Sequence, residues 1–330
     1  MRGLVLEEST FLLELRSLAG RGLHGEVLER LATLPPDELA RRTPFALLAA
    51  EAHGRLGAHA EAERWAVAAR DAARQRGERH AELRALSVQG AIALERGDGD
   101  AAMQHISAAL DVAREVGDHT AQARCLNNLG IIAQLHGEPE HALATYKLAL
   151  AAYQQAGLLR GMAETHHNIA ISLRNLGDHV SALRAADEAV RIAGGAGDEA
   201  LAALTLAGRA ELHLLLGDVE LAAVELSRAS PVAERVHDHA GLVETWRLQA
   251  GVARVRGRDD EAVALLERAA VLGREHGNAN TLADIERDLG AVLAARGDAA
   301  GARAARERAI ALLRRLGAKK AASELAALIA

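Results

Sequence analysis

Two asparagines, Asn128 and Asn168, stand 40 residues apart in the middle of segments whose apolar spacing predicts helices. Asparagine is a poor helix former, so its presence in mid-helix is locally unfavourable and indicates a use for the side chain. A side-chain amide can donate a hydrogen bond to a carbonyl and accept one from an N–H group. This chemistry suits binding the backbone of an extended peptide. Bonds between neighbouring helices or to solvent are the alternative explanation.

Other reactive residue types lack the spacing that their chemistry requires. His136 with His141, and His237 with His239, are close in sequence, but neither pair has a third ligand at helical spacing. Cys125 lies on a predicted packed helix, where it is expected to be a small buried apolar residue. The sequence therefore predicts no metal site and no cysteine nucleophile.

Two glycine- and aspartate-rich phrases resemble binding loops and are better explained as helix boundaries. Gly20, Gly22 and Gly25 spell G-x-G-x-x-G, but the preceding LLELRSLA predicts a helix, whereas a dinucleotide site needs a strand there. Asp98 and Asp100 resemble part of a calcium loop, but no glutamate closes it, so a helix N-cap is the better explanation. We therefore predict no cofactor and no enzyme activity.

Composition limits the classes of partner and compartment. The 330 residues carry a formal charge of −6 and a single cysteine. An acidic chain does not suit general nucleic-acid binding, and one cysteine allows no intramolecular disulfide. No long uncharged apolar stretch or signal-like amino terminus is present. The sequence predicts a cytoplasmic protein with no nucleic-acid or membrane partner.

The candidate residues are positioned by a repeat of constant length. One glycine returns every 40 residues without insertion or deletion, at Gly57, Gly97, Gly137, Gly177, Gly217, Gly257 and Gly297. Alanine occupies the positions five and twelve residues after each of these glycines. Self-similarity at a fixed period is the signature of a repeat architecture in which each unit packs on its neighbours.

Each repeat predicts two amphipathic helices separated by a turn at this glycine. A second helix end recurs at Gly77, Gly117, Gly157, Gly197, Gly277 and Gly317, with His237 as the exception. Aspartates that follow the first turn are candidate N-caps: Asp98, Asp178, Asp218 and Asp298. Seven residues before each first turn the residue is always Gly or Ala, as at Gly130, which would let the two helices cross closely. Pro231 falls within a second helix and is expected to kink or shorten it.

These small-residue and glycine positions resemble the tetratricopeptide repeat family, over about 280 of the residues. The period is 40 residues, against about 34 in the commonest form, and the large aromatics and terminal proline are missing. The longer repeats are similar to those of kinesin light chain and of the helical arms of signal-transducing ATPase regulators. The resemblance implies an all-α, right-handed superhelical solenoid of helix hairpins.

In this family the first helices line an inner groove, which implies the residues that face a ligand. The residues so implied are Arg84, Arg124, Asn127, Asn128, Gln134, His167, Asn168 and Arg174. The phrase LNNLG looks like the kinesin light chain pattern whose asparagines form a ladder along a bound peptide, although only two rungs are asparagine here. Along the next stripe the charge changes from basic at Arg84 to acidic at Asp284, which could orient a peptide or be ordinary solvated charge.

The expected organisation has three parts. Residues 1–36 form an imperfect capping repeat, 37–317 seven repeats, and 318–330 a capping helix, whose apolar Leu325, Leu328 and Ile329 leave a homodimer contact as the alternative. The function that follows is a non-catalytic scaffold that binds a protein or an extended peptide in the groove. A regulatory sensor arm that controls a partner ATPase or transcription factor, and a self-assembling structural module, are the alternatives.

Overall fold

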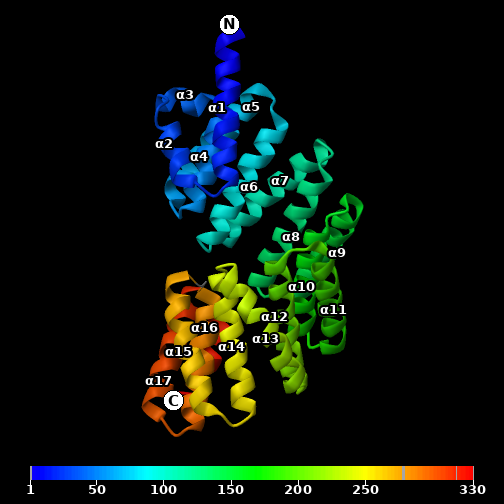
Figure 1. The fold of residues 1–330 in the computed structure, drawn as a ribbon, viewed down its shortest axis with the longest axis vertical. Coiled ribbons are helices and arrows are strands. Elements are labelled where there is room, and N and C mark those ends of the chain that lie inside the picture. Colours follow the sequence, from blue (N-terminus) through cyan, green and yellow to red (C-terminus); the bar gives the residue numbers. More distant parts are fainter. Residues whose placement is uncertain (1, 277–278, 317, 330) are drawn as a thin grey trace. The chain divides into compact units, whose positions relative to one another are not determined.

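The computed structural model describes residues 2–276, 279–316 and 318–329, and these residues form helices and short turns without any strand (Figure 1). The predicted all-α fold of tandem helix hairpins is confirmed. The chain divides into two compact units, which we call unit 1 (Met1–Gly157) and unit 2 (Leu158–Ala330). None of the described helices combines the length and the apolar character needed to cross a bilayer.

Unit 1 begins with three helices of uneven length and continues as three hairpins. The hairpins are α4/α5, α6/α7 and α8/α9, and α2 and α3 pack on the first of them. The helices of unit 1 are α1 (Arg2–Gly20), α2 (His24–Leu31), α3 (Pro36–Arg41), α4 (Thr43–Arg55), α5 (His59–Arg76), α6 (Arg79–Glu95), α7 (Gly99–Glu115), α8 (His119–Leu135) and α9 (Pro139–Ala156).

Unit 2 consists of four hairpins, α10/α11 to α16/α17, followed by a short last helix that packs on α17. Its helices are α10 (Leu159–Asn175), α11 (His179–Ala196), α12 (Glu199–Leu216), α13 (Val219–Arg235), α14 (His239–Val255), α15 (Asp259–His276), α16 (Ala279–Ala295), α17 (Ala299–Arg315) and α18 (Lys319–Ala327). In each hairpin of either unit, the first helix is the even-numbered one.

The repeated glycines end helices because their backbone is left-handed, a conformation that costs a residue with a Cβ atom. The predicted turn glycines in the described residues all have positive φ: Gly57, Gly77, Gly97, Gly117, Gly137, Gly157, Gly177, Gly197, Gly217, Gly257 and Gly297. At the exception, His237 takes the same conformation with φ of 55°. Gly277 and Gly317 lie outside the described residues.

Most of the aspartates that follow a turn cap the next helix. The carboxylates of Asp98, Asp178 and Asp298 each accept a hydrogen bond from the N–H group three residues on, as predicted. The prediction for Asp218 is wrong, because its side chain makes no capping bond. Its Oδ2 lies 3.6 Å from Nδ1 of His213 instead.

Small residues let the two helices of a hairpin cross closely. A Cβ atom placed on Gly130 would lie 2.5 Å from Cε1 of Tyr146, whose side chain is fully buried on α9. In the preceding hairpin, Gly90 meets Ile106 in the same way, at 2.4 Å from Cγ1. The close crossing predicted from the small residues is confirmed at these two hairpins.

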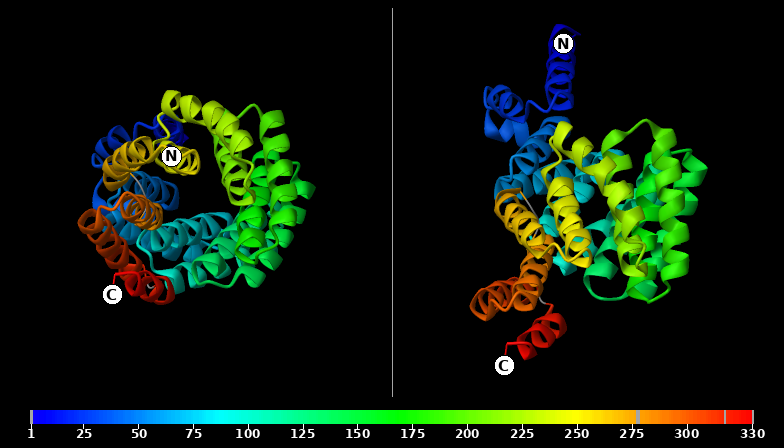
Figure 2. Two further views of the ribbon diagram at one scale, coloured as in Figure 1. Left: turned by 90° about the horizontal axis from the view of Figure 1, so that it is seen from below. Right: turned by 60° about the horizontal axis from the view of Figure 1, so that its bottom comes forward.

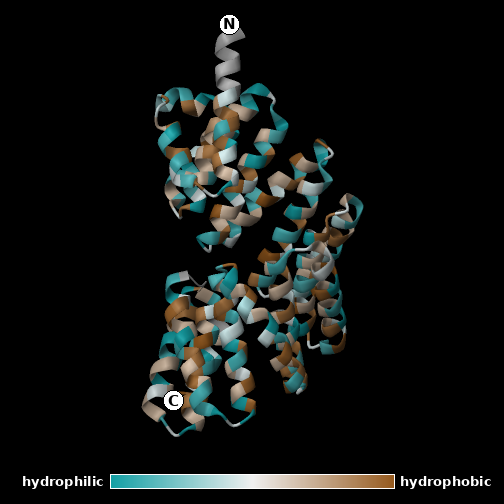
Figure 3. Ribbon diagram, in the orientation of Figure 1, coloured by the Kyte–Doolittle hydropathy of each residue, from teal (hydrophilic) through white to brown (hydrophobic). Residues whose placement is uncertain are grey.

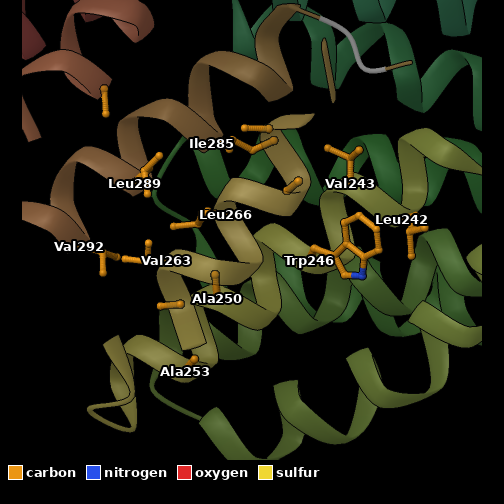
Figure 4. Packing of buried hydrophobic residues seen from close by; sticks show 14 of the residues in the cluster. Leu242, Val243, Trp246, Ala250, Ala253, Val263, Leu266, Ile285, Leu289 and Val292 are labelled. Atoms are coloured by element: carbon orange, nitrogen blue, oxygen red, sulfur yellow. The ribbon is translucent and has the colours of Figure 1, made fainter. Parts of the chain in front are cut away.

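Alanine and branched aliphatic side chains fill the cores. Figure 3 shows hydrophobic and hydrophilic residues interspersed along the coloured helices, and the buried apolar residues are mostly Ala, Leu, Ile and Val. In the largest core cluster of unit 2, Trp246 of α14 packs with Leu266 of α15 and Ile285 of α16 (Figure 4). Leu266 and Ile285 are almost completely buried. Within unit 1, α5 and α7 each pack against first helices on both sides, and α11, α13 and α15 do the same within unit 2.

Two further expectations concern single residues. Pro231 lies inside α13, but the helix continues to Arg235, so the expected shortening is wrong. The proline is exposed, so the carbonyl that loses its helical partner can face solvent. Cys125 is buried, as predicted, and burial raises the pKa of its thiol to about 11, which keeps it protonated and unreactive.

Candidate functional site

The exposed side of the first helices is the candidate binding surface, which we call the first-helix face of each unit. In unit 2, α10, α12, α14 and α16 contact one another in series (Figure 2). In unit 1, α4 contacts α6. Direct contacts between successive first helices bring polar side chains from different repeats within reach of one another.

On α8 of unit 1, a stripe of side chains points to solvent. Arg124, Asn128, Ile131 and Leu135 are spaced four, three and four residues apart, so they share one side of the helix. Arg124 is exposed and Asn128 is half-buried, and within the described part of the chain neither has a hydrogen-bond or ion-pair partner. Leu135 is 57% exposed. We call these four residues the α8 stripe.

The other predicted site residues of unit 1 interact with neighbouring groups of the protein. Arg84 of α6 is exposed, but its Nη2 atom lies 2.6 Å from Oε1 of Glu51 on α4. Asn127 is buried, and both Asn127 and Gln134 interact with other protein groups. Arg124 and Asn128 are therefore the two predicted polar residues on this face whose hydrogen-bonding groups are left for a ligand.

In unit 2, one arginine joins three first helices. Arg247 of α14 donates hydrogen bonds to Glu211 of α12 at 3.0 Å and to Asp288 of α16 at 3.1 Å. It also binds Glu244, one turn earlier on α14, at 2.5 Å. The side chain is only 10% exposed. Burial alone would lower the pKa of Arg247, but the bond to Glu244 and the surrounding carboxylates raise it, so the guanidinium stays charged.

The pairing extends on both sides of Arg247. Arg174 of α10 pairs with Glu211, and Arg287 of α16 pairs with Asp284 at 2.6 Å and with Asp288 at 3.2 Å. We call the resulting set the ion-pair chain: Arg174, Glu211, Glu244, Arg247, Asp284, Arg287 and Asp288. It connects α10, α12, α14 and α16 across the first-helix face. The acidic end of the predicted charge gradient is thus paired with arginines of the same face.

The side chain of His167 on α10 lies over Gly208, the position on α12 that would carry the next asparagine of the proposed ladder. A Cβ atom on Gly208 of α12 would lie 2.5 Å from Cε1 of His167, so the ring rests on the backbone of α12. Burial lowers the pKa of His167, although the nearby Glu211 opposes that shift. Asn168 is half-buried and interacts with other protein groups. The ring therefore occupies the space at Gly208 that a third asparagine side chain would need.

Asn128 and Asn168 belong to different units, so the first-helix face of each unit has to be considered alone. The pairs that join different helices of the ion-pair chain were missed in the sequence because their members stand 36 to 41 residues apart, and only the 40-residue period hints that such residues meet. Histidine, cysteine and acidic side chains do not gather in groups of three suited to a metal ion anywhere in the described ranges.

Comparison with known proteins supports the repeat assignment. Residues 82–155 match the family model of the tetratricopeptide repeat. No curated protein sequence matches the chain. The resemblance predicted from the glycine and alanine spacing is confirmed by this match and by the solved structures that share the fold.

Three solved structures illustrate the shared fold. A Rap protein in complex with competence and sporulation factor is 16% identical, with a TM-score of 0.65 over 98% of this chain and 96% of that one. The Rap conjugation gene regulator of plasmid pLS20, in complex with the Phr* peptide, is 14% identical, with a TM-score of 0.66 over 85% of this chain and 76% of that one. A signal transduction ATPase of Pyrococcus horikoshii with a tetratricopeptide repeat sensor is 16% identical, with a TM-score of 0.63 over 79% of this chain and 41% of that one.

Proposed function

We propose that this chain, of which residues 82–155 match the tetratricopeptide repeat model, is a non-catalytic scaffold that binds an extended peptide or a segment of a partner protein on a first-helix face. The proposal draws on the two Rap structures, one solved with competence and sporulation factor and the other with the Phr* peptide. We place the centre of binding on the α8 stripe of unit 1.

The observation that carries this choice is the absence of protein partners for Arg124 and Asn128 among the described residues. An exposed guanidinium offers a planar pair of donors to a carboxylate. The amide of Asn128 can bind a peptide N–H or carbonyl group. One and two turns further on, Ile131 and the exposed Leu135 provide apolar contact. The stripe therefore fits a segment with an acidic residue followed by an apolar one.

The test begins by selecting a peptide ligand for the protein. A random peptide library displayed on phage is selected against the full chain, and the enriched peptide is synthesised with a fluorescent label. Its affinity is measured by anisotropy for the wild type, for the double variant Arg124→Ala, Asn128→Ala, and for a matched control. The control, Arg114→Ala with Gln104→Ala, likewise removes one guanidinium and one side-chain amide, from exposed positions on α7, a second helix of unit 1.

We expect the α8 variant to bind the selected peptide at least about tenfold more weakly, since charged hydrogen bonds contribute on the order of 1.5–3 kcal/mol each. The control is expected to bind like the wild type, and circular dichroism should show equal helicity for all three proteins. Equal affinity of the α8 variant and the wild type would contradict binding at the α8 stripe.

A regulatory sensor is the second candidate, favoured by the fold shared with a sensor-bearing ATPase and a gene regulator. A sensor must change conformation when its ligand binds, whereas a scaffold need not. Hydrogen exchange distinguishes the two. A bound peptide that alters exchange only on its own face supports the scaffold, and altered exchange in helices remote from that face supports the sensor.

A further inference from the structure

Large apolar side chains are exposed along one edge of unit 2. They lie at the turns between first and second helices, in three successive hairpins, and each is between 37% and 62% exposed. We call this set the turn edge: Leu176, Val180, Leu215, Leu216, Leu221, Val224 and Val255. Contiguous exposed apolar surface is typical of interaction sites.

The three turns are neighbours in the structure. Because α10, α12 and α14 contact one another in series and run in the same direction, their carboxyl ends meet at one edge of the unit. The middle turn, between α12 and α13, carries four of the seven apolar residues. At the matching places one hairpin earlier than α10/α11, Leu135 stands where Leu215 does, but the other three positions hold His136, His141 and Ala144. The turn between α12 and α13 therefore carries three apolar residues that the turn between α8 and α9 lacks.

Negative charge lies at the centre of the turn edge. Asp218 is 54% exposed and does not cap α13, unlike the other aspartates described above. Its Oδ2 lies 3.6 Å from Nδ1 of His213, and no arginine or lysine pairs with it among the described residues. Glu220, two residues on, is 83% exposed and pairs with Arg256 at 2.7 Å. The apolar centre is therefore accompanied by one exposed carboxylate that neither caps a helix nor pairs with an arginine or lysine of the described residues.

We propose that the turn edge docks an amphipathic helix of a partner protein, with apolar side chains against Leu215, Leu216 and Leu221 and a lysine or arginine against Asp218. The apolar contacts would supply most of the affinity, because burying one leucine is worth about 1.5–3 kcal/mol. The pairing with Asp218 would select basic over acidic helices. This surface is distinct from the α8 stripe and does not depend on the function proposed for it.

The test uses two fluorescent peptides designed as amphipathic helices, one of leucine and lysine and one of leucine and glutamate in the same pattern. Anisotropy is measured with the full chain, with the double variant Leu216→Ser, Leu221→Ser, and with Asp218→Asn. Leu148→Ser on α9 of unit 1 is the matched control, because Leu148 is 60% exposed and lies outside the turn edge. Circular dichroism and thermal unfolding verify that the variants fold.

We expect the leucine–lysine peptide to bind the wild type and the control equally, and the double variant at least about tenfold more weakly. Asp218→Asn should reduce the ratio between the affinities for the leucine–lysine peptide and the leucine–glutamate peptide. The double variant Arg124→Ala, Asn128→Ala should bind this peptide like the wild type, which separates this surface from the proposed function.

Three results would overturn the proposal. The first is that the leucine–glutamate peptide binds as well as the leucine–lysine peptide. The second is that the double variant and the Leu148→Ser control bind the leucine–lysine peptide equally. The third comes from sedimentation velocity: a wild-type dimer that dissociates in Leu216→Ser, Leu221→Ser would show that a second copy of this chain occupies the turn edge.

Discussion

Arg124 on α8 of unit 1 and Arg247 on α14 of unit 2 are both arginines of first helices, but their surroundings differ. Arg124 is exposed and has no ion-pair partner in the described ranges, whereas Arg247 is nearly buried among three carboxylates. Residue type alone therefore does not identify a ligand-binding arginine in a repeat protein. What distinguishes them is whether the neighbouring repeats supply opposite charge within reach.

The largest expected effect comes from removing the centre of the ion-pair chain. Arg247→Met keeps most of the side-chain volume but leaves Glu211, Glu244 and Asp288 without their shared partner. We expect the free energy of unfolding in urea to fall by about 2–3 kcal/mol, since breaking a buried pair leaves uncompensated charge. The loss should shrink when sodium chloride screens the carboxylates.

Arg235→Met is the control for this measurement. Arg235 also pairs across neighbouring helices, with Glu199 at 2.7 Å, but both side chains are at least 60% exposed. Exposed pairs contribute only about 0–1 kcal/mol. Equal losses for Arg247→Met and Arg235→Met would show that the ion-pair chain has no special structural role.

A second comparison concerns two glycines that contact an aromatic ring. Alanine at Gly130 would push on the fully buried Tyr146, and alanine at Gly208 would push on the partly exposed His167. Overpacking costs about 1–3 kcal/mol, and we expect Gly130→Ala near the upper end because the buried ring has less room to move. Urea unfolding of both variants measures the difference.

Gly54→Ala in α4 provides the reference for the two glycine variants. The nearest atom to its added Cβ lies 4.0 Å away, so alanine should fit without displacing a neighbour. Since alanine has the higher helix propensity, we expect a gain of about 0.5–1 kcal/mol. A Gly208→Ala variant less stable than Gly130→Ala would contradict the claim that the ring of Tyr146 has less room to move than the ring of His167.

A smaller gain is expected at the one repeat turn that lacks glycine. His237 of unit 2 has φ of 55°, where a residue with a Cβ atom is strained. His237→Gly should raise the midpoint of thermal unfolding, with a stabilisation of about 1 kcal/mol. The reverse change in unit 1, Gly117→His, should lower the midpoint by a similar amount. A lower midpoint for His237→Gly and a higher one for Gly117→His would contradict the role of the left-handed turn.

The smallest expected effect depends on pH. The pKa of His167 is lowered in the folded chain, mainly by burial, so between this pKa and about 6.5 the unfolded chain binds more protons than the folded one. Stability is therefore fully present above about pH 6.5 and is lost as the pH falls. Urea unfolding of the wild type and of His167→Gln at about pH 7.5 and 5.5 measures it.

We expect the wild type to lose more stability than His167→Gln over this range. The lowered pKa values of His53 and His166 affect both proteins equally and cancel in the difference. Charges of Glu211, Glu244 and Arg174 surround the ring, so the comparison is made at one salt concentration. A variant that loses as much stability as the wild type would exclude His167 as the group responsible.

The sequence predicted those features that depend on local backbone geometry. Glycine at Gly57 or Gly137 specifies a left-handed turn by itself, and the small residue at Gly130 specifies a close crossing within its own hairpin. These features follow from residue type and spacing, because each one is decided within a single repeat.

Features that depend on contacts between repeats were not predicted. The bonds from Arg247 to Glu211 and Asp288 require the rotation between hairpins, which the spacing of apolar residues does not give. A local feature was missed as well, because Asp218 follows a turn glycine like Asp98 and Asp178 but its carboxylate lies near His213, five residues earlier in the same hairpin, and leaves the cap open. Pro231 is tolerated because its position near the end of α13 is exposed.

The central claim is that a ligand binds the first-helix face of unit 1. On the first-helix face of unit 2, by contrast, the charged side chains pair with one another. Hydrogen–deuterium exchange of the full chain, with and without the selected peptide, tests it directly. We predict slower exchange in α8, with α12, α14 and α16 unchanged. Protection confined to α12, α14 and α16 would contradict the claim and place the ligand on the ion-pair chain.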